Sequence, residues 1–248
     1  MSINSWGGRG TLIINAIKMA SRVDADAIQF KHPFSMILSG NRRTGKTHFT
    51  KTLILRNREL IAPPIDRVFW FYASHQADVF SEIDANAAGA ELAIEYAKGL
   101  PSDDIMETVD ARSGKKLIII DDLMEEASNR SDVSNLFTKG RHSDVSVIFL
   151  TQNLFHKGKY SREISLNTDY MVNFKNPRDS SIITNLGRQM GNTKFLQDVY
   201  RDATKEAYSH LLIDMRADTD NRLRYRSNVL QDTQRVYQPD WRARRSTV

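Results

Sequence analysis

The sequence of 248 residues contains no cysteine. Disulfide bonds, thiolate metal sites and cysteine nucleophiles are therefore excluded, and the fold must rest on packing alone. The lack of thiols suits a protein that works inside a cell or a virus particle. Purely apolar runs are short, such as Leu117 to Ile120, and the N-terminus has no basic segment followed by an apolar one. We expect neither a membrane span nor an export signal.

Neither sign of charge dominates, and no internal repeat is present. The formal net charge is +5 and the isoelectric point is near 9.4, a mildly basic balance that favours a polyanionic partner without identifying one. The length allows one α/β domain with a sizeable core. We expect this core over residues 30–230, an N-terminal arm or peripheral helix over 1–29, and a basic, mobile tail over 231–248.

The segment from Phe34 to Thr47 has the pattern of a phosphate-binding P-loop: an apolar strand, a G-x-x-x-x-G-K-T turn, and a helix-compatible run from Lys46 to Arg58. The expected nucleotide-binding residues are Gly40, Asn41, Arg42, Arg43, Thr44, Gly45, Lys46 and Thr47. Backbone N–H groups and the positive end of the helix would point at phosphate oxygens. Lys46 would reach the β- and γ-phosphates, and the Thr47 hydroxyl would ligate Mg²⁺. The pattern predicts binding of ATP with Mg²⁺.

Strands alternate with helices along the rest of the chain, which predicts a doubly wound, mostly parallel sheet flanked by helices. The expected strands are Arg67 to Tyr72, Lys116 to Ile120, Val145 to Leu150 and Tyr170 to Phe174. The expected helices are Phe80 to Lys98 and Ser128 to Thr138. A polar turn near the C-terminus lies between two strand-like segments, Ser209 to Met215 and Leu223 to Leu230. This pattern predicts a C-terminal β-hairpin added to the core. The predicted class is the RecA-like (ASCE) P-loop NTPase fold.

The strand Lys116 to Ile120 ends in two acids, Asp121 and Asp122, which is a Walker B signature. We expect this strand beside the P-loop strand, so that Asp121 coordinates Mg²⁺ directly or through water. Asp122 is then placed to orient or deprotonate the attacking water. The alternative is that Asp122 caps the following helix. Glu125 is the reserve candidate for the base.

Two further polar positions complete the expected site. Gln152 follows the strand Val145 to Leu150 and could contact the γ-phosphate and the lytic water. Arg141 lies at the corner before that strand, where its guanidinium could neutralise charge on a neighbouring subunit's γ-phosphate. The alternative for Arg141 is a surface ion pair with Asp144. Its rivals as an arginine finger are Arg162, Arg178 and Arg188.

With these four elements in this order, the chain resembles the viral genome-packaging ATPases of the FtsK/HerA superfamily, the poxvirus-type group shared by Maverick/Polinton elements and adintoviruses. The resemblance rests on His32 to Phe34 before the P-loop, Ile118 to Leu123, Gly140 to His142 before Leu150 to Asn153, and Asn173 to Asp179. The paired loop arginines depart from the pattern. So does aspartate in place of the glutamate often found as base, which puts the assignment of Asp122 in doubt.

The resemblance implies a ring of five or six subunits that hydrolyses ATP between neighbours, with Arg141 acting in trans. Such a ring pushes double-stranded DNA into a preformed capsid. It implies docking on the capsid or its portal vertex, and action in the nucleus or cytoplasm of an infected cell, with association with the virion left open. No nuclease domain is evident in the sequence.

Several basic residues are candidates for contact with DNA phosphates, and for each a solvated surface role is an equal alternative. They are Lys157, Lys159 and Arg162 after Gln152, and Arg222, Arg224 and Arg226 in the hairpin. Other functions also fit a P-loop. They are a related helicase or extrusion ATPase, a non-motor nucleotide-binding module that assembles on a capsid, and a nucleoside kinase. For the kinase, no acceptor pocket or arginine-bearing lid can be located in the sequence.

Overall fold

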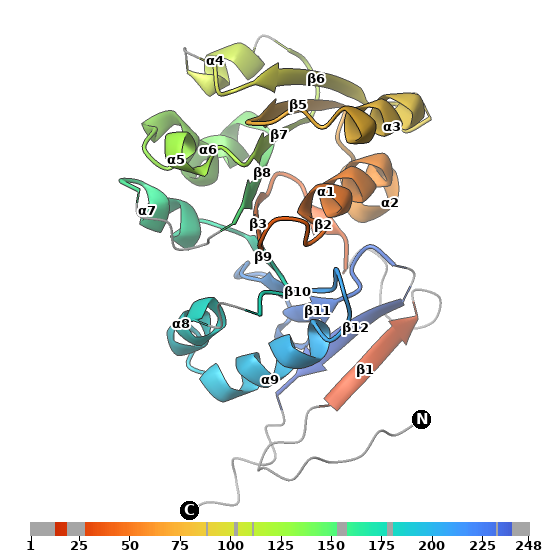
Figure 1. The fold of residues 1–248 in the computed structure, drawn as a ribbon, viewed down its shortest axis with the longest axis vertical. Coiled ribbons are helices and arrows are strands. Elements are labelled where there is room, and N and C mark those ends of the chain that lie inside the picture. The colour runs from red at the N-terminus through yellow and green to blue at the C-terminus, as the bar shows by residue number, and fades with distance from the viewer. Residues whose placement is uncertain are drawn as a thin grey trace, which may run out of the picture.

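A ten-stranded sheet with helices on both faces forms the molecule (Figure 1). The structure is a computed structural model that describes residues 13–18, 28–87, 89–101, 104–110, 112–152, 158–177, 181–231 and 233–239, with the backbone alone for 13–18, 108, 110, 141 and 142. The strand order is β1-β12-β11-β10-β9-β3-β8-β7-β5-β6. The predicted α/β fold, with a large central sheet flanked by helices, is confirmed.

One part of the sheet is parallel. Its strands are β3 (Ser35–Ser39), β5 (Arg67–Tyr72), β6 (Ala93–Lys98), β7 (Lys116–Asp121), β8 (Val145–Thr151) and β9 (Tyr170–Phe174). β3 pairs with β8 and β9, and β8 also pairs with β7. The expectation that β7 lies beside β3 is therefore wrong, because β8 separates them. All six strands end at the same side of the sheet, which we call the carboxyl edge.

The remaining strands are antiparallel and extend the sheet beyond β9. They are β10 (His210–Asp214), β11 (Tyr225–Ser227), β12 (Thr233–Gln238) and β1 (Ile13–Lys18). The predicted C-terminal hairpin is present as β10 and β11, which pair antiparallel. It does not end the sheet, because β12 pairs with β11 and β1 pairs with β12.

The N-terminal segment 1–29 and the C-terminal segment 231–248, which were expected outside the core, both contribute strands to the sheet. Residues 13–18 form the strand β1 rather than a peripheral helix, because they pair along their whole length with β12. Residues 233–238 of the expected tail form β12 itself. Residues 1–12, 19–27 and 240–248 lie outside the described part of the chain.

Helices cover the sheet in two layers (Figure 1). One layer contains α1 (Lys46–Leu55), α2 (Asn57–Leu60) and α3 (Ala77–Ala87). The other contains α4 (Ile105–Asp110), α5 (Met124–Ala127), α6 (Ser131–Lys139), α7 (Ser161–Leu166), α8 (Ser181–Gln189) and α9 (Thr193–Ala203). Alternate strand residues feed the two cores, so that Met36 and Leu38 pack with Phe49 of α1, while Ile37 packs in the cluster that contains Val133 of α6.

Smaller elements complete the described chain. β2 (Phe30–Lys31) and β4 (Ile61–Ala62) form a two-stranded parallel sheet, and the short 3₁₀ turns are η2 (Gly140–Ser143) and η3 (Asn221–Leu223). None of the helices in the described ranges combines the length and apolar character that crossing a bilayer requires.

Three helix predictions differ from the structure. The segment Phe80 to Lys98 is not one helix: α3 ends at Ala87, and Ala93–Lys98 forms the edge strand β6, paired with β5. Its Ala- and Glu-rich composition is misleading because an edge strand is partly exposed and needs no continuous apolar run. The helix expected from Lys46 is interrupted at Arg56, and the one expected from Ser128 begins at Ser131.

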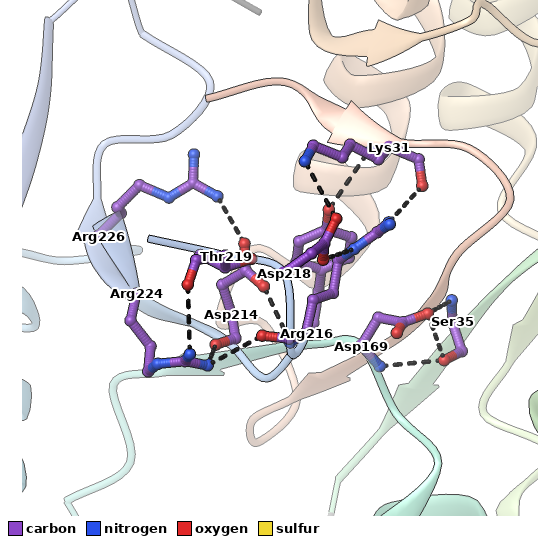
Figure 2. Close-up of polar contacts among 10 residues, drawn as sticks. Lys31, Ser35, Asp169, Asp214, Arg216, Asp218, Thr219, Arg224 and Arg226 are labelled. Atoms are coloured by element: carbon purple, nitrogen blue, oxygen red, sulfur yellow. Dashed lines mark hydrogen bonds and ion pairs between the residues drawn. The ribbon is translucent and has the colours of Figure 1, made fainter. Parts of the chain in front are cut away.

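A buried ion pair ties β10 to β11 at the end of the sheet opposite the carboxyl edge (Figure 2). Arg226 and Asp214 are 1% and 6% exposed in their side chains, and Nη2 lies 3.5 Å from Oδ2. Arg226 Nη1 also donates to the Ile28 carbonyl at 2.7 Å, and Arg224 Nη1 donates to the Asp214 carbonyl at 2.6 Å. Charge buried at this depth must stay paired, because an isolated buried ion is strongly unfavourable.

A more exposed cluster lies beside this pair (Figure 2). Asp218 accepts from Lys31 Nζ at 3.2 Å and from Arg216 Nε at 3.1 Å, and these two cations hold the pKa of its carboxyl down to about 2. Arg216 Nη1 also donates to the Lys31 carbonyl at 2.9 Å. The cluster fastens the turn after β10 to β2.

Replacement of Arg226, in β11, should change the stability of the protein differently from replacement of Arg222, in η3 just before this strand. We expect Arg226→Leu to lower the free energy of unfolding by about 3–5 kcal/mol, because Asp214 would be left buried and unpaired. Arg222→Leu removes an exposed arginine that pairs with Asp220, and it should leave the denaturation midpoint unchanged. Urea denaturation of both variants measures this.

The double variant Arg226→Leu/Asp214→Asn, which leaves no buried charge, should recover part of the loss. Equal stability of Arg226→Leu and Arg222→Leu would contradict a dominant role for the buried pair.

Candidate functional site

The P-loop connects β3 to α1 at the carboxyl edge, as the sequence predicts. Gly45 has φ 101, a left-handed conformation that favours glycine, and it precedes the first residue of α1. A Cβ atom on Gly40 would lie 2.7 Å from Thr44 Oγ1 and 2.8 Å from Phe174 Cβ. The two glycines of the motif are therefore required by backbone conformation and by close packing, respectively.

Lys46 lies folded back over the loop. Its Nζ donates to the Gly40 carbonyl at 2.6 Å and to the Asn41 carbonyl at 2.9 Å. Burial lowers the pKa of Lys46, while the nearby carboxylates of Asp121 and Asp122 act in the opposite direction. The lysine is thus held inside the loop, with both acids of the Walker B segment in electrostatic reach.

The other loop residues differ in their surroundings. Asn41 Nδ2 donates to Asn176 Oδ1 at 2.9 Å, which joins the loop to the segment after β9. Thr44 Oγ1 donates to the Asn41 carbonyl at 2.9 Å. Arg42 and Arg43 are exposed, and Arg43 has φ 60. The positive charge of Arg42 contributes to the lowered pKa of Lys46, so this arginine lies close enough to add charge to the loop.

Asp121 is the last residue of β7 and is buried, with 5% of its surface exposed. Its Oδ2 accepts a hydrogen bond from Gln76 Nε2 at 3.1 Å. Burial raises the pKa of the Asp121 carboxyl to about 6. The charge on Asp122 acts in the same direction, whereas Trp70, Lys46 and Gln76 lower the pKa. A buried carboxylate at the end of this strand is an oxygen ligand for which the protein provides little compensating charge of its own.

Asp122 is exposed and has φ 58, and its Oδ1 accepts from Gln152 Nε2 at 2.9 Å. It does not cap the next helix: the residue before α5 is Leu123, and α5 has no side-chain cap. The alternative that Asp122 caps the following helix is therefore wrong. Glu125 is exposed in the first turn of α5.

Gln152 reaches Asp122 because β8 lies between the P-loop strand and the Walker B strand. Thr151 pairs with Ser39 of β3, and its carbonyl accepts from the Gly40 amide at 3.2 Å. On the other side of β8, Leu150 pairs with Asp121. The strand β8 therefore places Gln152 between the P-loop and the two acids, Asp121 and Asp122.

The corner that contains Arg141 is the turn η2, immediately before β8. The side chain of Arg141 lies outside what the structure describes. Asp144 follows at φ 55, and its Oδ1 accepts from Nε2 of the buried His32 at 3.1 Å. His32 Nδ1 lies 2.6 Å from Ser146 Oγ in β8, so this histidine connects the corner to the strand.

The candidate DNA contacts fall into two separate places. Lys159 and Arg162 are exposed near α7, after the carboxyl end of β8. The hairpin arginines lie at the opposite end of the sheet. Arg222 is exposed and bonded to Asp220, and Arg226 is buried. Arg224 donates to backbone carbonyls (Figure 2).

Arg226 is therefore a structural residue and not a surface contact. Lys157 lies outside the described residues. Of the rival finger residues, Arg162 and Arg188 are exposed on α7 and α8, and Arg178 is outside the described residues.

Gln76 was missed by the sequence interpretation. It follows β5, and the carboxyl end of every parallel strand lies at the same edge, so polar residues after Tyr72 were a signal that could have been used. Tyr208 and His210 were also missed. They line a cleft beside the P-loop, and no sequence motif marks them.

The chain is similar in sequence to one described family. The profile of the family described as "Poxvirus A32 protein" matches residues 21–225, which is most of the chain. This match confirms the predicted resemblance to poxvirus-type viral packaging ATPases. No curated protein matches the chain.

Three solved structures resemble the fold at low identity. The genome packaging NTPase B204 from Sulfolobus turreted icosahedral virus 2, in complex with ATP-gammaS, is 16% identical, with 73% of this chain and 92% of that chain covered and a TM-score of 0.49. The flagellar accessory protein FlaH from Methanocaldococcus jannaschii is 15% identical, covering 62% and 78%, with a TM-score of 0.43. EccC (ATPases 2 and 3) from Thermomonospora curvata, in complex with a signal sequence peptide, is 14% identical, covering 75% and 39%, with a TM-score of 0.43.

The buried carboxylate of Asp121 should cost stability in the nucleotide-free protein. Its pKa is about 6 in the folded protein against an ordinary 3.8, so the folded state binds this proton more tightly than the unfolded chain does. The resulting loss in the free energy of unfolding is fully present above pH 6 and disappears as the pH falls below about 4. We expect Asp121→Asn to raise the free energy of unfolding by about 1–3 kcal/mol at pH 8 and to change it little at pH 4.

Chemical denaturation at the two pH values measures this effect. Asp122→Asn, at the exposed neighbouring acid, is the matched control and should give no comparable gain. A loss of stability in Asp121→Asn at pH 8 would show that the charge is compensated in the folded protein.

Proposed function

The chain belongs to the Poxvirus A32 protein family, and on this basis we propose that it is the ATP-hydrolysing motor that moves double-stranded viral DNA into a preformed capsid. Family membership makes it an ATPase of viral genome packaging. The observation that supports the motor mechanism is the meeting of three elements at the carboxyl edge. These are the P-loop after β3, Gln152 after β8, and Asp121 and Asp122 at the end of β7.

The P-loop residues bind the triphosphate of ATP in this proposal. The N–H groups of residues 40–47 and the N-terminus of α1 surround the phosphates, and Lys46 leaves its two carbonyl partners to meet the β- and γ-oxygens. A charged phosphate oxygen is a stronger acceptor for an ammonium group than a backbone carbonyl is. Nucleotide binding therefore replaces the contacts between Lys46 and the carbonyls of Gly40 and Asn41.

The residues present fit Mg²⁺. Thr47 supplies a hydroxyl from the first turn of α1, and Asp121 supplies a buried carboxylate, both of which are the hard oxygen donors that this ion prefers. The described residues hold no group of three acidic or histidine ligands, and Mg²⁺ bound with nucleotide phosphates needs none. When bound, the ion neutralises charge on the phosphate oxygens.

Asp122 and Gln152 would handle the attacking water. The carboxylate and the amide are hydrogen-bonded at 2.9 Å, so a water that reaches one also reaches the other. Asp122 is the assigned base because its carboxylate faces this amide, whereas Glu125 lies a turn further along on α5. Gln152 has a donor and an acceptor, which suits a residue that senses whether the γ-phosphate is intact.

Arg141 would complete the site of a neighbouring subunit. Asp144, the alternative partner for Arg141, accepts a hydrogen bond from the buried His32. A head-to-tail ring places one subunit's corner against the next subunit's nucleotide, and a ring closes such contacts without leaving free ends. The motor would be a pentamer or hexamer docked on the capsid or its portal vertex in an infected cell.

The proposed contacts to DNA are Lys159 and Arg162. They follow β8, so they lie near the residues that would sense ATP hydrolysis, whereas Arg222 lies at the far end of the sheet and is bonded to Asp220. Contacts of this kind depend on phosphate charge and would be weakened by salt irrespective of DNA sequence.

The test of this function is ATPase activity measured against protein concentration, with and without duplex DNA. We expect the activity per subunit to rise with concentration as rings form, and to rise further with duplex DNA at low salt. Lys46→Ala should abolish turnover, and Lys194→Ala, at an exposed lysine on α9, should not change it. Turnover per subunit that depends on neither concentration nor DNA would contradict the motor and favour a simple nucleotide-hydrolysing module.

Mixing two inactive variants tests the arginine finger. Arg141→Ala should bind ATP and lose about 10³- to 10⁵-fold in turnover. Asp122→Ala should also be inactive. In an equal mixture, about a quarter of the interfaces in a head-to-tail ring pair an intact Asp122 with an intact Arg141, so activity should return.

The parent activity with its concentration dependence is the reference for the mixture. Full DNA-stimulated activity in Arg141→Ala alone would exclude the finger. A mixture no more active than its two components would show that Arg141 does not act in trans.

A further inference from the structure

A cleft of about 1130 Å³ opens beside the P-loop and is larger than a triphosphate requires. One wall consists of the loop and the first turns of α1, from Arg43 to Phe49. The opposite wall comes from the segment before β10 and from the segment between β11 and β12, in residues 202–210 and 227–235. The base and ribose of a nucleotide bound at the P-loop need such a space, and the motif itself provides no group for them.

Tyr208 projects from the second wall next to the loop. It is 69% exposed, which is unusual for a large aromatic side chain, and its backbone is in the left-handed region at φ 60. A Cβ atom on Gly45 would lie 3.5 Å from Tyr208 Cβ and 3.8 Å from its Cδ1, so the ring adjoins the last glycine of the P-loop. Backbone strain of this kind in a non-glycine residue persists where the surroundings fix it, and it gathers at functional sites.

The segment around Tyr208 is anchored on both sides. Ser209 Oγ donates to the Glu206 carbonyl at 2.7 Å, and the Lys175 amide donates to the Ser209 carbonyl at 3.3 Å. Lys175 Nζ also donates to the Lys205 carbonyl at 2.7 Å. These bonds attach the segment to the end of β9, the strand next to β3, and so fix the tyrosine relative to the phosphate loop.

A second aromatic ring, His210, lies in the same wall of the cleft. His210 packs edge-on against Phe49 with ring centroids 5.0 Å apart, and burial lowers its pKa to about 4, so its ring is neutral at pH 7. Among the described residues, nothing forms a hydrogen bond with His210 Nε2, although this atom is buried. Almost none of the surface of Nε2 is exposed, so a nucleoside in the cleft cannot reach this atom, and His210 contributes to the wall as a neutral aromatic ring.

We propose that the cleft binds the base of a purine nucleoside triphosphate, with the Tyr208 ring stacked on the base. The proposal rests on the proposed function, because it assumes that the triphosphate occupies the P-loop. A purine offers a larger stacking face than a pyrimidine, so ATP and GTP bind more tightly than CTP and UTP. The amides of Asn228 and Gln231 line the far wall and can read the edge of the base.

The test compares ATP with inorganic tripolyphosphate, which carries the phosphates and lacks the base. Isothermal titration calorimetry with the full chain and Mg²⁺ gives both dissociation constants. We expect Tyr208→Ala to weaken ATP about 10- to 100-fold and to leave tripolyphosphate unchanged within about 2-fold. Tyr208→Phe, the matched control, keeps the ring and should bind ATP as the parent does. Lys46→Ala should weaken both ligands.

Each other outcome has a separate meaning. Unchanged ATP affinity in Tyr208→Ala overturns the stacking role and leaves the proposed ATPase standing. Weakening of tripolyphosphate by the same factor as ATP overturns it too, because the tyrosine would then be supporting the loop. Failure of the parent protein to bind either ligand overturns the nucleotide site together with this inference.

Discussion

The site depends on one constraint, which is that the strands β9, β3, β8, β7 and β5 all run parallel and end at the same edge of the sheet. Residues far apart in the sequence meet at this edge because of the common strand direction alone. Lys46, Gln152 and Asp121 follow or end three neighbouring strands. The width of the site is then set by strand spacing, because β8 lies between the phosphate loop and the acids.

This arrangement gathers charge that the protein does not fully compensate. Burial raises the pKa of Asp121 and lowers that of Lys46, so each charged group loses hydration on being placed at the edge. Lys46 donates to two carbonyl oxygens, and Asp121 accepts from the amide of Gln76. These are neutral partners, and they can be exchanged for a phosphate oxygen and a metal ion without leaving another charge unpaired. The site is thus suited to a ligand that carries charges opposite to those of Lys46 and Asp121.

The sequence alone predicts those parts of the site whose residues lie next to one another in the chain. The P-loop and the acids after β7 are encoded in single segments, so a strand followed by a few polar residues predicts both the element and the chemistry at its end. The order of the strands was not readable, because it depends on which strand pairs with which. We expected β7 beside β3, and only the structure places β8 between them.

The ends of the chain were missed for a related reason. β1 pairs with β12 across more than two hundred residues, and although both segments contain β-branched residues, neither indicates a partner so distant in the sequence. β6 was mistaken for helix because an edge strand tolerates Ala, Glu and Lys. Tyr208 and His210 were not found because neither a left-handed backbone angle nor an unpaired buried nitrogen leaves a pattern in the sequence.

The antiparallel strands have a geometric consequence for the site. An antiparallel strand begins where its parallel neighbour ends, so β10 starts at the carboxyl edge, and His210 pairs with Phe174 at the end of β9. The segment leading into β10 is therefore placed beside the P-loop, which a further parallel strand would not achieve. The turn between β11 and β12 returns to the same edge and adds Asn228 and Gln231 to the cleft. The segments before β10 and between β11 and β12 thus form the second wall of the cleft beside the P-loop, and the buried pair Asp214–Arg226 joins β10 to β11 toward the opposite edge of the sheet.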